Sequence, residues 1–184
     1  MQIQKNDDDS TKRIKSEFNH LYQNPFSGVG IPLGIPDPEN IYIWRITLLA
    51  PKDTSYRGGL FFLNIILPRD YPEHPPEFCF KTPIYHTNVN PIKPNKKEDK
   101  PLGHVWIPFL SSMNYKSIIR EVIPYIFGLF YIHNPDSPYA LDRAKEFKEN
   151  KAIYEQKAKY FTKKYANPVN ANKENNESWD FSYI

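Results

Sequence analysis

The sequence predicts an α+β fold with an N-terminal helix, an antiparallel sheet and C-terminal helices. Three observations predict it: apolar residues recur at helical spacing near the start, three later segments are continuously apolar or alternate with period two, and helical spacing returns after residue 115. With 184 residues, of which 40% are hydrophobic, the chain can bury the core of one domain and still carry tails. One domain is therefore expected.

A first amphipathic helix is expected over residues 10–22. Three aspartates (Asp7–Asp9) and Ser10 precede it, and anionic or hydroxyl side chains stabilise the free N–H groups at a helix start. Helical spacing is then kept by Ile14, Phe18, Leu21 and Tyr22. Residues 24–38 are rich in proline and glycine, which break helical periodicity, so they are predicted to be a connector.

Three segments are predicted to be strands: residues 41–49, 60–67 and 77–81. They are rich in β-branched and aromatic residues, which favour a pleated, buried surface. A polar turn ending in Gly58-Gly59 separates the first two, and a proline-rich stretch separates the second from the third. Such short connections predict antiparallel strands of one meander.

The C-terminal half is predicted to be helical. Residues 118–130 are apolar almost all round, which is typical of a helix buried against a sheet. Pro124 lies inside this run; because an interior proline costs about 3 kcal/mol, a kink or two shorter helices are expected. Ser137 and Pro138 are expected as N-cap and first-turn residue of the next helix. The last helix is marked by Tyr154, Ala158, Phe161 and Tyr165.

Composition excludes several classes of function. The net charge of +3 comes from 24 basic and 21 acidic residues that are scattered along the chain, so nucleic-acid binding is not expected. A single cysteine, Cys79, forms no internal disulfide and holds no metal without other ligands, so neither a metal nor a cofactor is expected. No export signal or membrane-spanning run is visible, and a cytoplasmic or nuclear protein is expected.

Several short motifs fall in the order and spacing of a known family. They are the turn 51–59, the Arg69-Asp70-Tyr71-Pro72 stretch, the segment 84–88, the segment 134–138 and the closing 163–166. Together they resemble the ubiquitin-conjugating family over residues 10–167. The resemblance implies that family's fold, with a four-stranded antiparallel meander, flanked here by tails at 1–9 and 168–184.

The resemblance also locates a degenerate catalytic site. Active members carry His-Pro-Asn, whose asparagine lies near the reacting thioester and helps the oxyanion or orders a loop; this chain has His86-Thr87-Asn88. Their nucleophilic cysteine corresponds to Trp106, and an indole cannot form a thioester. Ser137 occupies a position where the family has aspartate or serine. The four positions imply a conjugating fold without conjugating activity.

Neither neighbouring feature is expected to restore a nucleophile. Cys79 lies between two phenylalanines in a predicted strand, where burial hides the sulfur and raises the thiol pKa. Trp106 is expected to pack over the groove that a reactive cysteine would leave open, against Tyr85 or Phe109. A lysine-rich insertion at about residues 91–102 is expected to be a solvated loop or a surface for an acidic partner.

Partner-binding candidates lie at both ends of the chain. Lys12 and Arg13 match the basic residues with which the family meets the activating enzyme, although a solvated helix face explains them equally well. In the tail, Trp179, Phe181 and Tyr183 alternate among acids; they form either a docking segment for a partner or a segment that folds back on the domain. Departures from the family at Glu73-His74 and around residues 111–115 argue against binding of RING-type ligases.

Three functions remain open. The favoured one is a non-catalytic binding or scaffold module that offers its surface to ubiquitin, to an active conjugating enzyme or to a multi-subunit complex. The second is an enzyme that uses an unrecognised nucleophile, or an obligatory subunit of one. The third is a purely structural subunit of a large complex that reuses the fold.

Overall fold

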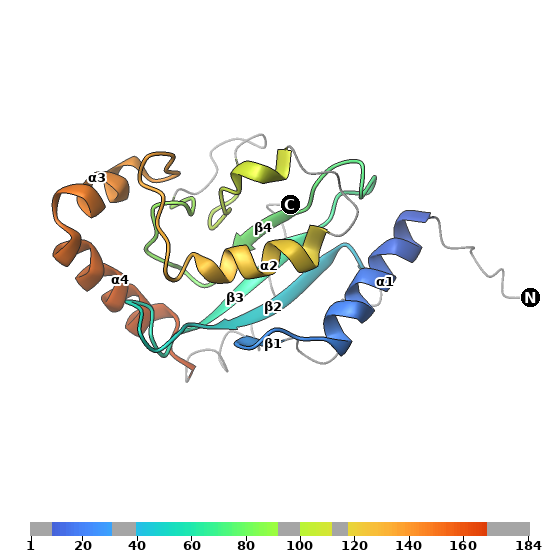
Figure 1. The fold of residues 1–184 in the computed structure, drawn as a ribbon, viewed down its shortest axis with the longest axis horizontal. Coiled ribbons are helices and arrows are strands. Elements are labelled where there is room, and N and C mark those ends of the chain that lie inside the picture. Colours follow the sequence, from blue (N-terminus) through green and yellow to red (C-terminus); the bar gives the residue numbers. More distant parts are fainter. Residues whose placement is uncertain (1–8, 31–39, 92–99, 112–117, 169–184) are drawn as a thin grey trace, which may run out of the picture.

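The computed structural model describes residues 9–30, 40–91, 100–111 and 118–168. In these residues, four antiparallel strands form one sheet in the order β1-β2-β3-β4, preceded by one α-helix and followed by a 3-10 helix and three α-helices. Figure 1 shows α2 crossing one face of the sheet, with α1 at one end and α3 and α4 at the other. The elements are α1 (Asp9–Gln23), β1 (Val29–Gly30), β2 (Ile43–Leu49), β3 (Leu60–Ile66), β4 (Glu77–Phe80), a 3-10 helix (Pro108–Ser111), α2 (Ile118–Gly128), α3 (Leu141–Glu149) and α4 (Lys151–Tyr165).

The predicted α+β class is confirmed, and so are the three predicted strands. The fourth strand, β1, lies inside the segment expected to be only a connector: Val29 pairs with Leu48, and Gly30 pairs with Thr47. A strand of two residues is too short to show a period. Gly28, at φ +78°, turns the chain toward β2 and accepts a hydrogen bond from the Leu49 N–H at 2.8 Å.

At Pro124 the structure has one helix, not the two shorter helices that were expected as the alternative to a kink. α2 runs from Ile118 to Gly128 with the proline inside it. Pro124 lies on the exposed side, where water can hydrate the carbonyl that loses its helical donor. The opposite side is buried in the core through Ile119, Val122, Ile123 and Ile126. This burial, at about 1.5 to 3 kcal/mol per large apolar side chain, outweighs the lost hydrogen bond.

The predicted N-cap at Ser137 is wrong. α3 begins at Leu141, and its N-cap residue Ala140 makes no side-chain cap. Ser137 instead lies in a loop, where both its N–H and its carbonyl bond to asparagine side chains. The turn into α4 is capped by Asn150, whose side chain accepts from the Ile153 N–H at 3.2 Å.

Candidate functional site

A short extended segment at residues 103–107 brings Trp106 to the surface of the domain. Gly103 has φ +83°, and a side chain there would collide with the backbone of Phe80, so the turn needs glycine. The segment then runs beside β4, with the Val105 N–H donating to the Phe78 carbonyl at 2.8 Å. The next N–H, that of Trp106, donates to the Asn88 carbonyl at 3.0 Å. Trp106 and Asn88 are therefore backbone neighbours.

The Trp106 side chain faces solvent. Its neighbours Val105 and Ile107 are 2% and 6% exposed, whereas Trp106 is 45% exposed, as alternation along an extended segment requires. The Tyr85 ring packs on Tyr154 and Phe161 with centroid distances of 5.3 Å, and the ring contacts among the described residues include none between Tyr85 and Trp106. The side chain of Phe109 lies outside the described part. The indole that is expected at the nucleophile position is thus accessible.

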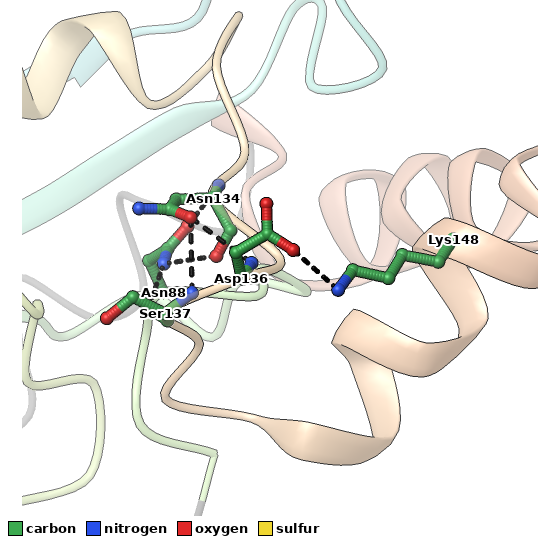
Figure 2. A network of polar contacts seen from close by, with 5 residues as sticks. All are labelled: Asn88, Asn134, Asp136, Ser137 and Lys148. Carbon is green, nitrogen blue, oxygen red and sulfur yellow. Dashed lines mark hydrogen bonds and ion pairs between the residues drawn. The ribbon is translucent and has the colours of Figure 1, made fainter.

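Asn88 is buried, and its side-chain amide is fully hydrogen-bonded (Figure 2). Oδ1 accepts from the Thr87 hydroxyl at 2.8 Å and from the Asn134 N–H at 2.9 Å. Nδ2 donates to the carbonyls of Asn134 and Ser137, both at 3.0 Å. An amide has two donors and accepts about two bonds, so none of its donors remains for a developing oxyanion in this conformation. Asn88 orders the loop over residues 134–137.

Asn134 completes that loop from within. Its Oδ1 accepts from the N–H groups of Asp136 and Ser137, both at 3.2 Å, which is an Asx turn. The Asp136 carboxylate pairs with Lys148 on α3 at 2.6 Å, an exposed contact that adds little stability (Figure 2). The contribution of Asn134 to the site was not predicted from the sequence, although Asn-Pro-Asp is a sequence typical of turns.

Thr87 and His86 fix the segment from the other side. The Thr87 hydroxyl donates to Asn88, a bond that proline at this position cannot make, and the Thr87 carbonyl accepts from the N–H groups of Tyr139 and Ala140. His86 is fully buried; its Nδ1 accepts from the Asn88 N–H at 3.0 Å, so Nε2 carries the proton and donates to the Leu129 carbonyl at 2.9 Å. His86 is therefore a neutral structural residue.

A second histidine stacks on the first. The rings of His86 and His133 are 4.5 Å apart, and Phe147 covers the other face of His133 at 4.8 Å. Burial and the neighbouring ring lower the pKa of His86 to about 3, whereas burial and nearby Lys151 lower the pKa of His133 to about 4. Both rings are neutral near pH 7.

Cys79 is not available as a substitute nucleophile. It lies in β4, opposite Asn64 of β3, and is 3% exposed, as the sequence predicts. Burial, with help from the nearby carboxylate of Glu77, raises the pKa of its thiol to about 12. Thiolate at neutral pH is negligible under these conditions. Among the described residues, no group of three or more His, Cys, Asp or Glu side chains is placed to hold a metal ion.

Lys12 and Arg13, the two candidate partner-binding residues on α1, differ in their exposure and in their contacts. Lys12 is largely exposed and pairs with Asp9 of the same helix at 3.3 Å. Arg13 is half-buried: it pairs with Glu17 at 2.8 Å and lies 5.8 Å from the centre of the Tyr71 ring. Lys12 can therefore reach a partner without breaking core contacts, whereas Arg13 also fastens α1 to the domain.

Two further predicted segments are only partly described. At the base of the insertion, Asn90 Nδ2 donates to the carbonyls of Lys100 and Pro101 at 2.9 and 3.0 Å. Lys100 also pairs with Glu77, the first residue of β4. Residues 92–99 of the insertion lie outside the described part, as do Trp179, Phe181 and Tyr183 of the tail. In the described part, no helix has the length and hydrophobicity needed to cross a membrane.

Known proteins match both the sequence and the fold. The family model for ubiquitin-conjugating enzyme matches residues 13–162. Probable ubiquitin-conjugating enzyme E2 31 of Arabidopsis thaliana is 39% identical over 131 residues, which cover 70% of this chain and 77% of that protein. A crystal structure assigned as a ubiquitin conjugating enzyme from Plasmodium yoelii matches with a TM-score of 0.73 and 25% identity, covering 87% of this chain and 97% of that one. This chain belongs to the ubiquitin-conjugating enzyme family.

Proposed function

We propose that this chain is a non-catalytic member of its family and works as a binding module in a ubiquitin pathway or a larger protein assembly. One observation carries the proposal: Trp106, the residue that the resemblance places where the family has its cysteine, lies beside Asn88 and is exposed to solvent. An indole has no nucleophile that could accept an acyl group and release it again. The geometry of the site suits contact with a partner protein rather than transfer of ubiquitin.

Two further features support a binding role. The Asn88 amide forms its hydrogen bonds with the loop at residues 134–137, and these bonds order the surface around Trp106. This ordering requires no catalytic role of Asn88. An exposed tryptophan on a rigid support is also the kind of residue that dominates binding energy at protein interfaces. Ubiquitin and an active conjugating enzyme are the partners that the family suggests.

The alternative is an enzyme, or an obligatory subunit of one. It is favoured by the Arabidopsis relative, which is 39% identical to this chain and is named as a probable ubiquitin-conjugating enzyme. Within the described residues, the thiol it would need belongs to Cys79, which burial keeps protonated and out of reach. The alternative therefore requires either an opening of β4 or a nucleophile of another kind.

Binding is tested by titrating the full chain into ¹⁵N-labelled ubiquitin, and in parallel into a ¹⁵N-labelled active conjugating enzyme. We expect specific amide shifts with at least one of the two, and Trp106→Ala is expected to weaken that affinity about tenfold, a typical loss for a tryptophan at a contact centre.

The matched control is Tyr160→Ala, which removes another exposed aromatic, from α4, and should leave the affinity unchanged. If neither titration shifts any signal, the binding proposal is wrong in its ubiquitin form. Equal weakening by both substitutions would place the contact away from Trp106.

A further inference from the structure

A groove runs between the turn at residues 51–58 and α4, away from Trp106. It consists of two adjoining hollows of about 400 and 500 Å³ that share Ser55, Arg57 and Lys159. The first extends toward Tyr131 and His133, and the second ends at Asn167 and Pro168, where the described part of the chain stops.

Among the described residues that line the groove, cations outnumber acids. Its cations are Lys52, Arg57, Lys151, Lys159 and Lys163. Ion pairs form elsewhere on the described surface, for example Lys157 with Glu146 and Lys148 with Asp136, but none involves these five. Of the two acids in the groove, Asp53 accepts a hydrogen bond from the Tyr131 hydroxyl at 3.2 Å. The groove therefore favours an anionic segment.

Aromatic side chains line the first hollow. Phe130, Tyr131, His133, Phe147 and Tyr154 all contribute to it. Tyr131 is 53% exposed, and the neutral His133 ring lies against Phe147. A segment that suits this groove carries acids for the rim and flat apolar rings for the floor.

The chain's own tail has both kinds of residue. Beyond Pro168 the sequence has Glu174, Glu177 and Asp180 against one lysine, Lys173, and its aromatics are Trp179, Phe181 and Tyr183. From Pro168, which itself lines the groove, the following residues span on the order of 50 Å when extended, enough to follow its whole length. Covalent attachment at the mouth also gives the tail a high effective concentration there.

We propose that residues 169–184 bind intramolecularly in this basic, aromatic groove, with their acids on its lysines and arginine. The inference is independent of the proposed function, since neither the groove nor the tail includes Trp106 or Asn88. In this proposal the tail binds its own domain and not another protein.

The test places a nitroxide label on Ser178→Cys in the ¹⁵N-labelled full chain and measures amide signal loss. The native Cys79 is 3% exposed and does not compete for the label. We expect the amides of Gly58 and Lys159, which line the groove, to lose most of their intensity, and amides of α1 to keep theirs. In 1 M salt, where charges are screened within about 3 Å, the loss should diminish.

Charge reversal separates docking from chance proximity. Arg57→Glu with Lys159→Glu is expected to restore the groove signals, whereas Lys12→Glu with Lys15→Glu on α1 changes the charge equally and should not. Adding Glu174→Lys, Glu177→Lys and Asp180→Lys to the groove double variant should bring the signal loss back.

The proposal is overturned if the groove amides keep their intensity in the labelled chain, or if the groove double variant still loses signal. It is also overturned if the same loss appears when nitroxide-labelled ¹⁴N chain is mixed with ¹⁵N chain that carries no nitroxide, because the tail then binds a second copy.

Discussion

Asn88→Ala is expected to lower the free energy of unfolding by about 3 kcal/mol. The substitution removes four hydrogen bonds and leaves the N–H of Asn134 and the carbonyls of Asn134 and Ser137 without their partner. An unsatisfied buried polar group costs about 1 to 3 kcal/mol, and water admitted to the loop recovers part of the sum. Urea denaturation of the full chain measures the loss.

The matched control is Asn90→Ala, two residues further on and also buried. Asn90 bonds to Lys100 and Pro101 at the base of the insertion and does not touch the loop at residues 134–137. Amide hydrogen exchange should therefore accelerate at Asp136 and Ser137 in the Asn88 variant and stay slow in the control. Slow exchange at both positions in the Asn88 variant would show that the loop is held by other contacts.

Acidification from pH 7 to pH 5 is expected to cost on the order of 2 kcal/mol of stability for each of His86 and His133. Folding lowers the pKa of His86 to about 3 and of His133 to about 4, below the ordinary value of 6.5. Below pH 6.5 the two histidines bind protons in the unfolded chain but stay neutral in the folded chain. Their contribution to stability is therefore complete above pH 6.5 and is lost as the pH falls toward about 4 for His133 and about 3 for His86. Most carboxylates titrate lower, which keeps pH 5 to 7 a histidine window.

His133→Phe isolates one of the two contributions. Phenylalanine keeps a ring between His86 and Phe147, and Tyr56 retains its 2.8 Å hydrogen bond to the Tyr85 carbonyl. We expect the dependence of unfolding free energy on pH near pH 5 to fall by about 1.4 kcal/mol per pH unit in this variant. Thermal or urea unfolding at several pH values provides the slope. An unchanged slope would mean that His133 is protonated in the folded state.

The sheet and the buried thiol could be predicted because their signals are local. β2 and β3 are long apolar runs, and Cys79 is flanked by phenylalanines, so pattern alone places them inside. The fourth strand, which the resemblance implied, could not be located at β1 because its pairing with β2, not its own two residues, makes it a strand. For α2, the pattern left a kinked helix and two shorter helices open, since the exposure of Pro124 depends on which side of the helix meets the sheet.

The sequence did not predict the hydrogen bonds that join the four residues of the candidate site. The resemblance named His86, Asn88, Trp106 and Ser137, and the structure joins Asn88 to each of the other three by a hydrogen bond. The hydrogen bonds from Asn88 to Asn134 join positions 46 residues apart, and no local pattern carries such a pairing. The outward turn of Trp106 likewise follows from the burial of Val105 and Ile107, which only the packed domain decides.

The central claim is that Trp106 leaves the chain without a nucleophile for ubiquitin, and a charging assay tests it most directly. The full chain is incubated with activating enzyme, ubiquitin and ATP, beside an active conjugating enzyme as positive control, and analysed by intact mass and on a non-reducing gel. We predict a thiol-sensitive adduct on the positive control and none on this chain. A thiol-sensitive ubiquitin adduct on this chain that disappears in Cys79→Ser would contradict the claim and assign the chemistry to the strand cysteine.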